Sequence, residues 1–254
     1  MALITGSGSG IGRAAAILLA RNGATVVVTD LDGSAAENVA SEIGQYGGIA
    51  TSSPLDVTQE PEWQRVVEAV LSAHQRLDVL VNNAGVSLAK PTDTMTLAEW
   101  RRVISVNMDG VFLGTKQAIL AMKKGGGGSI VNVASVSGIK PAGGASAYCA
   151  SKAAVRMFSM TAAIECADAK TGIRVNLVSP GGVKTPMWEK MPFFQDLIAQ
   201  HGGVQQAFGA MEGKVPSQQF FVPEEVAETI LYLTSDESSH LTGIEIVLDR
   251  GHTA

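Results

Sequence analysis

Apolar residues along the chain fall into two alternating kinds of segment. Short runs rich in β-branched residues predict strands, and longer segments with apolar residues at helical spacing predict amphipathic helices. The predicted strands are residues 2–5, 25–29, 48–52, 77–81, 129–134, 173–178 and 243–248. The predicted helices are residues 11–22, 34–46, 61–74, 97–123, 146–170 and 223–235.

Alternating strands and helices predict βαβ units and a parallel sheet. Right-handed crossovers then place helices on both faces of the sheet. We therefore expect an α/β chain with one doubly wound, Rossmann-like domain over residues 1–254, built on a seven-stranded parallel sheet. One stretch, residues 187–222, interrupts the alternation for longer than an ordinary connection does. It carries Phe193, Phe194, Phe208, Phe220 and Phe221, which are five of the seven phenylalanines.

Composition and charge exclude several classes of protein. The chain has 19 Lys+Arg and 24 Asp+Glu, and the net charge of −5 without a basic run predicts no nucleic-acid partner. No apolar run reaches the ~18 residues of a membrane span, and no secretory signal is evident, so a cytoplasmic protein is expected. Two cysteines and four scattered histidines give neither a disulfide framework nor metal-ligand spacing, so no metal site is expected. Charged residues are only 17% of the chain, which suggests that another subunit covers part of the surface.

A glycine-rich turn follows the first predicted strand and precedes the first predicted helix. Residues 5–12 read T-G-S-G-S-G-I-G, with the spacing T-G-x-x-x-G-x-G. Such a turn brings the backbone and the free N–H groups of a helix N-terminus close to a pyrophosphate. The alternative is a purely structural turn. The candidate dinucleotide-binding residues here are Gly6, Ser9, Gly10, Ile11 and Gly12.

Asp30 stands at the end of the second predicted strand, 18 residues after Gly12. A carboxylate there accepts hydrogen bonds from the adenosine ribose and repels a 2′-phosphate. Neither Ser9 nor the neighbouring Leu31 is basic, and the role of Arg13, the one nearby cation, is ambiguous. NAD is therefore favoured over NADP, with Leu31 beside the same site. The alternative is that Asp30 is a solvated strand end or a helix cap.

Further motifs follow in order along the chain, and together with the turn they resemble the short-chain dehydrogenase/reductase family over essentially its whole length. This resemblance implies an NAD(P)-dependent oxidoreductase. It adds cofactor contacts from the segments after the third, fourth and sixth strands, at Asp56, Val57, Asn83, Ala84, Gly85, Pro180, Gly181, Val183 and Thr185. It implies that Asn107, Ser135, Tyr148 and Lys152 form the catalytic set. One departure is Asp249-Arg250-Gly251, where many members of the family carry D-G-G.

The chemistry of alcohol oxidation suits the catalytic candidates. Tyrosine is a poor base at its ordinary pKa of about 10, and a nearby ammonium lowers that pKa. Tyr148 and Lys152 are four residues apart and share one helical face, so we expect Lys152 to lower the pKa of Tyr148. Ser135 suits a hydrogen bond to the substrate oxygen. By resemblance, Lys152 also holds the nicotinamide ribose, and Asn107 anchors a water in a proton relay.

The family resemblance makes residues 187–222 a substrate lid and specificity insertion. Met187 and Trp188 join Ser135 and Tyr148 as candidate substrate-binding residues. The apolar lid predicts a hydrophobic, cyclic or aromatic secondary alcohol or ketone. The alternative is that its apolar residues pack on the core or on another subunit.

The leading interpretation is an enzyme that transfers a hydride between NAD(H) and such a substrate, with tyrosine as general acid and base. The alternatives are a 3-oxoacyl-thioester reductase of lipid synthesis and, outside enzymes, a nicotinamide-sensing regulatory protein. Residues 146–170 are apolar around much of the helix. The resemblance implies assembly through such helices, because members of the family are commonly homotetramers. We therefore predict a homotetramer.

Overall fold

The computed structural model describes residues 1–213 and 215–254 and confirms the predicted architecture. Seven strands form one parallel sheet in the order β3-β2-β1-β4-β5-β6-β7. The strands are β1 (Ala2–Thr5), β2 (Thr25–Asp30), β3 (Ile49–Pro54), β4 (Val79–Asn82), β5 (Gly128–Val133), β6 (Ile173–Pro180) and β7 (Glu245–Leu248). The strand order reverses between β1 and β4, which in sheets of this kind is where ligands bind.

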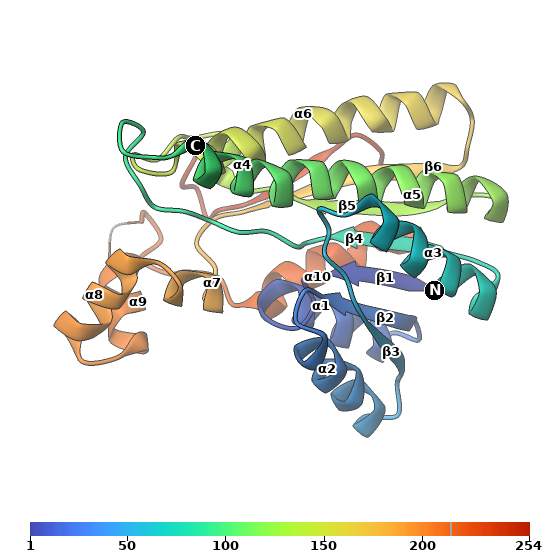
Figure 1. Cartoon of the computed structure of the whole chain (residues 1–254), viewed down its shortest axis with the longest axis horizontal. Helices are drawn as coiled ribbons and strands as arrows, with labels where there is room; N and C mark the ends of the chain where they lie inside the picture. The colour runs from blue at the N-terminus through green and yellow to red at the C-terminus, as the bar shows by residue number, and fades with distance from the viewer. Residues whose placement is uncertain (214) are drawn as a thin grey trace.

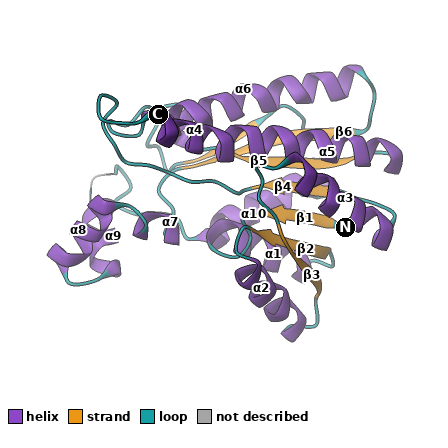
Figure 2. Cartoon of the chain, viewed as in Figure 1, coloured by secondary structure: helices purple, strands orange, loops and turns teal. Residues whose placement is uncertain are grey.

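Two apolar layers hold helices against the two faces of the sheet. Because successive side chains of a strand point to opposite faces, Ala2 and Ile4 join one layer while Leu3 joins the other. The first layer packs α1 (Gly10–Arg21), α2 (Gly33–Gln45) and α10 (Pro223–Thr234) against the sheet. The second packs α3 (Glu60–His74), α5 (Gly110–Gly125) and α6 (Ser146–Asp168) against it. Figures 1 and 2 show the sheet between these two layers.

The helix predicted over residues 97–123 is not one uniform α-helix. It divides into α4 (Leu97–Ile104), a π-helical turn η1 (Ser105–Asp109) and α5. Apolar spacing does not reveal such a turn, because only one turn of the backbone departs from α-helical bonding. Asn107 lies within it and is fully buried. A π-helical turn inside a helix often marks a functional position, and here it contains a predicted catalytic residue.

The insertion after β6 folds into three short helices that the strand and helix pattern does not predict. They are α7 (Pro186–Glu189), α8 (Pro192–His201) and α9 (Val204–Glu212). Their apolar side chains form a separate cluster around Phe194, Phe208 and Phe220, distinct from the two layers of the sheet. Figure 1 shows α8 and α9 standing away from the sheet.

The other elements of residues 1–213 and 215–254 are two single 3₁₀ turns, η2 (Val136–Gly138) after β5 and η3 (Asp236–Ser238) after α10. Of the helices in the described ranges, none combines the length and the apolar character needed to cross a bilayer.

Candidate active site

The loops after β1 and β4 meet at the carboxyl edge of the sheet, where the strand order reverses. The Asn83 side-chain amide donates to the carbonyls of Thr5 and Gly6, at 2.9 Å each. The backbone N–H groups of Asn83 and Ala84 both donate to the Thr5 hydroxyl at 3.0 Å. Asn83 therefore shapes the glycine turn from the neighbouring strand, in addition to its predicted place at the cofactor.

The geometry of the turn fits a dinucleotide. Gly6 has φ +59°, and a Cβ on it would lie 2.7 Å from the Ala84 backbone. A Cβ on Gly12 would collide with the Gly6 carbonyl. The N-cap residue of α1 is Ser9, whose side chain makes no capping bond, and the first turn of α1 has no acidic residue. Free N–H groups at the start of a helix suit the negative charge of a pyrophosphate.

Asp30 lies beside this turn and not at a helix cap. Its Oδ2 accepts a hydrogen bond from the Gly8 N–H at 3.0 Å, while its Oδ1 accepts one from the Asp32 N–H. The cap of α2 is Asp32, whose carboxylate accepts from two backbone N–H groups of the first turn. Leu31 is 74% exposed at the same edge. Asp30 is therefore not the cap of α2, and its contact with a ribose stays a prediction beside the alternative of a solvated strand end.

The nearby cation is already engaged. The Arg13 guanidinium makes a forked ion pair with Glu42 of α2, using both its Nε and its Nη2. A cation that neutralises a 2′-phosphate would have to leave this pair. Arg13, whose role the sequence leaves ambiguous, thus links α1 to α2 through this ion pair.

The segments after β3 and β6 complete the same edge. The Asp56 carboxylate accepts from the Thr58 N–H and hydroxyl, at 2.9 and 2.7 Å. Val57 is buried, and its carbonyl accepts from the Trp63 indole at 3.0 Å. After β6, the Gly181 N–H donates to the Leu248 carbonyl.

This last segment returns to the glycine turn. A Cβ on Gly10 would lie 3.4 Å from the Thr185 methyl group. Val183, which precedes the insertion, makes an isolated bridge with Phe221 near the end of the insertion. Pro180 ends β6 at the same edge. All these predicted cofactor residues are therefore brought to one edge by the parallel strands.

Three predicted catalytic residues meet where β5 and α6 approach each other. Ser135 is the N-cap of η2, and its hydroxyl accepts from the Ser137 N–H at 3.1 Å. The Lys152 ammonium, 4% exposed, donates to the Val133 carbonyl at 2.8 Å. It lies 5.7 Å from the centre of the Tyr148 ring. The spacing of four on α6 therefore does place the ammonium beside the phenol.

The pKa of Tyr148 moves opposite to the predicted direction. Burial raises the pKa of the phenol, and hydrogen bonding with the Ser135 hydroxyl opposes this only in part. Burial also lowers the pKa of Lys152, from 10.5 to about 8. Desolvation moves the pKa of each group toward its neutral form, because each charged form loses water on burial. In this structure Tyr148 is a neutral phenol that can donate a proton.

The Asn107 side chain is fully occupied by neighbouring groups. Its Oδ1 accepts from the Val86 N–H at 2.8 Å, and its Nδ2 donates to the Val86 carbonyl and to the Ser151 hydroxyl. The Ser151 hydroxyl in turn donates to the Tyr148 carbonyl at 2.7 Å. Asn107 thus ties the loop after β4 to α6, and the water that it is predicted to anchor stays a prediction. Ser151 was not predicted, although its position three residues after Tyr148 puts it on the same helical face.

The aromatic residues of the insertion pack mainly on one another. The Trp188 ring lies 5.9 Å from that of Phe220 and 6.2 Å from that of Phe193, centre to centre. Its indole N–H donates to the Val183 carbonyl at 2.8 Å. Phe194 is fully buried in the same cluster, and Met187 packs at its margin. Most of these rings therefore form a core of the insertion's own, and the predicted role of the insertion as a substrate lid stays a prediction.

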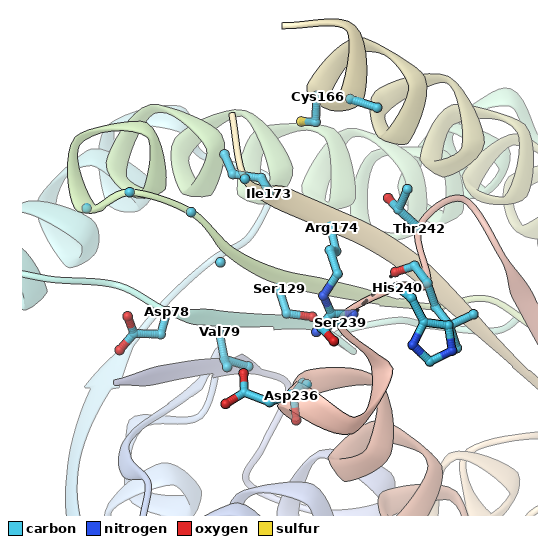
Figure 3. Close-up of a pocket in the computed structure, with 18 of the residues that line it drawn as sticks. Asp78, Val79, Ser129, Cys166, Ile173, Arg174, Asp236, Ser239, His240 and Thr242 are labelled. Carbon is cyan, nitrogen blue, oxygen red and sulfur yellow. Dashed lines mark hydrogen bonds between the residues drawn. The ribbon is translucent and has the colours of Figure 1, made fainter. Parts of the chain in front are cut away.

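A hollow of about 630 Å³ lies at the opposite edge of the sheet, where β4, β5 and β6 begin. Figure 3 shows Asp78, Ser129, Arg174 and His240 around it. None of the predicted site residues lines it. Within residues 1–213 and 215–254, no cluster of three or more His, Cys, Asp or Glu side chains is arranged to hold a metal ion.

Comparison with known proteins gives a family match and close relatives. Residues 1–195 match the family model described as short chain dehydrogenase. The chain is 39% identical over 252 residues to a cyclopentanol dehydrogenase of Comamonas sp. (strain NCIMB 9872), covering 99% of this chain and 96% of the relative. A solved short-chain type dehydrogenase/reductase from Mycobacterium marinum matches 100% of this chain and 95% of its own, with 36% identity and a TM-score of 0.89.

Other relatives carry out different reactions. A 3-oxoacyl-[acyl-carrier-protein] reductase of Thermotoga maritima is 40% identical over 249 residues, covering 98% of this chain and 96% of its own. An NADP-dependent (R)-specific alcohol dehydrogenase of Lentilactobacillus kefiri is 36% identical over 255 residues, covering 100% of this chain and 96% of its own. Similarity of this degree therefore spans more than one substrate and includes an NADP-dependent enzyme.

Proposed function

The chain belongs to the short-chain dehydrogenase/reductase family, and we propose that it interconverts a hydrophobic, cyclic secondary alcohol and its ketone with NAD as cofactor. The observation that carries this proposal is the arrangement of Ser135, Tyr148 and Lys152 at the carboxyl end of β5. The relative that acts on cyclopentanol supports the cyclic substrate class. Membership of the family itself makes the chain an NAD(P)-dependent oxidoreductase that acts on CH–OH groups.

The side chains divide the work of proton transfer. Tyr148 gives its proton to a ketone oxygen during reduction, which leaves a phenolate. In the oxidation direction it is this phenolate that takes the proton from the hydroxyl. The Ser135 hydroxyl donates to the same oxygen as charge develops on it. Lys152 holds positive charge next to the phenol and favours the phenolate that reduction leaves behind. When bound, the nicotinamide supplies the hydride acceptor for oxidation and the hydride donor for reduction.

Asp30 supports NAD over NADP. A 2′-phosphate at this place would meet the Asp30 carboxylate, and the nearest arginine, Arg13, is committed to Glu42. The repulsion is therefore not offset by a free cation within the described part of this edge. The predicted ribose contact needs only an acceptor, which Asp30 provides.

A homotetramer is also part of the proposal. Large apolar side chains lie exposed along α5 and α6, where Phe112 is 44%, Leu120 51%, Met157 62% and Ile164 61% exposed. Figure 1 shows these two helices side by side along one face. Exposed apolar stripes of this kind are typical of subunit contacts. A partner chain on this face would cover them.

The direct test is NADH production with cyclopentanol and a panel of cyclic, aromatic and acyl alcohols. We expect turnover of cyclic alcohols, and loss of at least ~100-fold in kcat for Tyr148→Phe with NADH binding retained. Tyr46→Phe, which removes an exposed hydroxyl, is the matched control. Turnover confined to a 3-oxoacyl thioester with NADPH would replace this function by the reductase alternative. Binding of NADH without turnover of any alcohol or ketone would favour a sensor.

A further inference from the structure

The last turn of the chain is held in an unusual conformation. Arg250 has φ +51°, in the left-handed region that glycine adopts easily and larger residues do not. The Asp249 carboxylate fixes this turn by accepting from the N–H groups of Gly251 and Thr253, at 2.9 and 2.7 Å. A long charged side chain thus stands at a position where a glycine would fit without strain.

The Arg250 side chain is directed at the end of the insertion. Its guanidinium donates to the Gln219 side-chain carbonyl and lies 4.4 Å above the Phe221 ring. It also forms an ion pair with Glu225, at 2.7 Å, in the first turn of α10. Gln219 and Phe221 are the last residues before the insertion rejoins the domain. Arg250 therefore connects the C-terminal end of the insertion to the start of α10 and to the chain terminus.

The same turn also contacts the other wall of the site. The Lys140 ammonium donates to the His252 carbonyl at 2.9 Å. Lys140 belongs to the loop between η2 and α6, which joins Ser135 to Tyr148 along the chain. The C-terminal turn consequently bridges two segments that flank the predicted catalytic residues, one through Arg250 and one through its own backbone.

We propose that Arg250 is a positioning residue that holds the insertion over the substrate site and thereby sets the affinity for the alcohol. This inference rests on the proposed function, in which the insertion covers the substrate. A strained backbone conformation persists where surrounding contacts determine it. Here those contacts are the three that Arg250 makes at the insertion and α10. Arg250 touches neither Tyr148 nor Ser135 in the structure, so its influence passes through the insertion.

The test compares Arg250→Gly and Arg250→Lys with the unaltered protein. Glycine relieves the backbone conformation and removes all three contacts, while lysine keeps the charge but lacks the planar fork. We expect Arg250→Gly to raise the KM for cyclopentanol about tenfold, with kcat changed less than about twofold, since an ion pair and a cation–π contact together are of this order. For Arg250→Lys we expect a KM between those of Arg250→Gly and the unaltered protein. Arg76→Ala, which breaks an exposed ion pair with Asp78 at the far edge, is the matched control.

A second readout does not depend on turnover. Chymotrypsin cleaves after exposed aromatic residues, and Phe193 in the insertion is 38% exposed. Cleavage in the insertion should be about tenfold faster in Arg250→Gly, with the melting temperature and the light-scattering mass unchanged. Unchanged cleavage in Arg250→Gly would overturn the proposal, whether or not an alcohol is turned over. If the unaltered protein oxidises no alcohol but cleavage is still faster in Arg250→Gly, the proposed function is wrong while the role of Arg250 in holding the insertion is supported.

Discussion

Replacing Lys152 by methionine should stabilise the protein near neutral pH while abolishing its activity. Lys152 is 4% exposed, and burial lowers the pKa of its ammonium from 10.5 to about 8. The unfolded chain therefore holds this proton more tightly than the folded chain does. The two pKa values differ by about 2.5, and each pKa unit corresponds to about 1.36 kcal/mol of free energy. The buried charge therefore disfavours folding at low pH by about 2.5 × 1.36, or about 3.4 kcal/mol.

A lost hydrogen bond opposes part of this gain. Methionine cannot donate to the Val133 carbonyl, which accepts from Lys152 at 2.8 Å. Leaving a buried acceptor without a donor costs about 1–3 kcal/mol. Subtracting this cost from about 3.4 kcal/mol leaves a net stabilisation of Lys152→Met of about 1–2 kcal/mol at neutral pH.

The sign of the effect reverses with pH. The cost of the buried ammonium is fully present below the folded pKa of about 8. Between about 8 and 10.5 the folded protein has lost the proton and the unfolded chain still holds it, so the unaltered protein gains stability as pH rises. The advantage of the methionine variant should fall by about 2.5 kcal/mol between roughly pH 7 and roughly pH 10, and methionine then becomes the less stable choice.

Urea unfolding at several pH values measures this difference. Protein concentration must be the same in all samples, because subunit association adds to apparent stability. Lys124→Met, a substitution of an exposed lysine at the end of α5, is the matched control and should show no such pH dependence. A difference in unfolding free energy between Lys152→Met and the unaltered protein that stays constant with pH would refute the reasoning.

Three further predictions concern the cofactor, the site and the assembly. Asp30→Asn keeps an acceptor for the Gly8 N–H but removes the charge, so the ratio of kcat/KM for NAD to that for NADP should fall at least about tenfold; an unchanged ratio would separate Asp30 from cofactor choice. Ser151→Ala leaves a buried Asn107 N–H without its acceptor, so urea unfolding should show a loss of about 1–3 kcal/mol, with kcat lowered as α6 loses its tie to the loop after β4. Met157→Glu places a charge on the exposed apolar face of α6 and should reduce the mass found by light scattering to that of a smaller assembly. If light scattering shows that the unaltered protein is already a stable monomer, the predicted tetramer is wrong.

The sequence predicts this site well because the fold converts order along the chain into position in space. The carboxyl ends of parallel strands meet at one edge, so motifs that follow β1, β2, β4, β5 and β6 must come together. Tyr148 and Lys152 needed only a helix to share a face. These inferences depend on backbone periodicity alone, and the structure places the residues accordingly.

What the sequence does not predict depends on contacts between side chains and on burial. The direction of the Tyr148 pKa follows from desolvation, which no spacing of residues reveals. The π-helical turn around Asn107 and its bonds to Val86 require the loop after β4 to be in place. Arg250 appears in the sequence only as a departure from a glycine pattern, and its partners lie 25 to 31 residues earlier in the chain.

The way the insertion packs limits which of its residues can meet a substrate. Because Phe194, Phe208 and Phe220 are buried against one another, their apolar area stabilises the insertion itself and is not available to a substrate. Polar contacts join it to the domain: Lys184 with Glu212, the Trp188 indole with the Val183 carbonyl, and Arg250 with Gln219. Phe221 adds a bridge with Val183 and packs against the first apolar layer. A cover with its own core keeps its shape when such contacts break. Its fit over the alcohol therefore depends more on these contacts than on how many aromatic residues it contains.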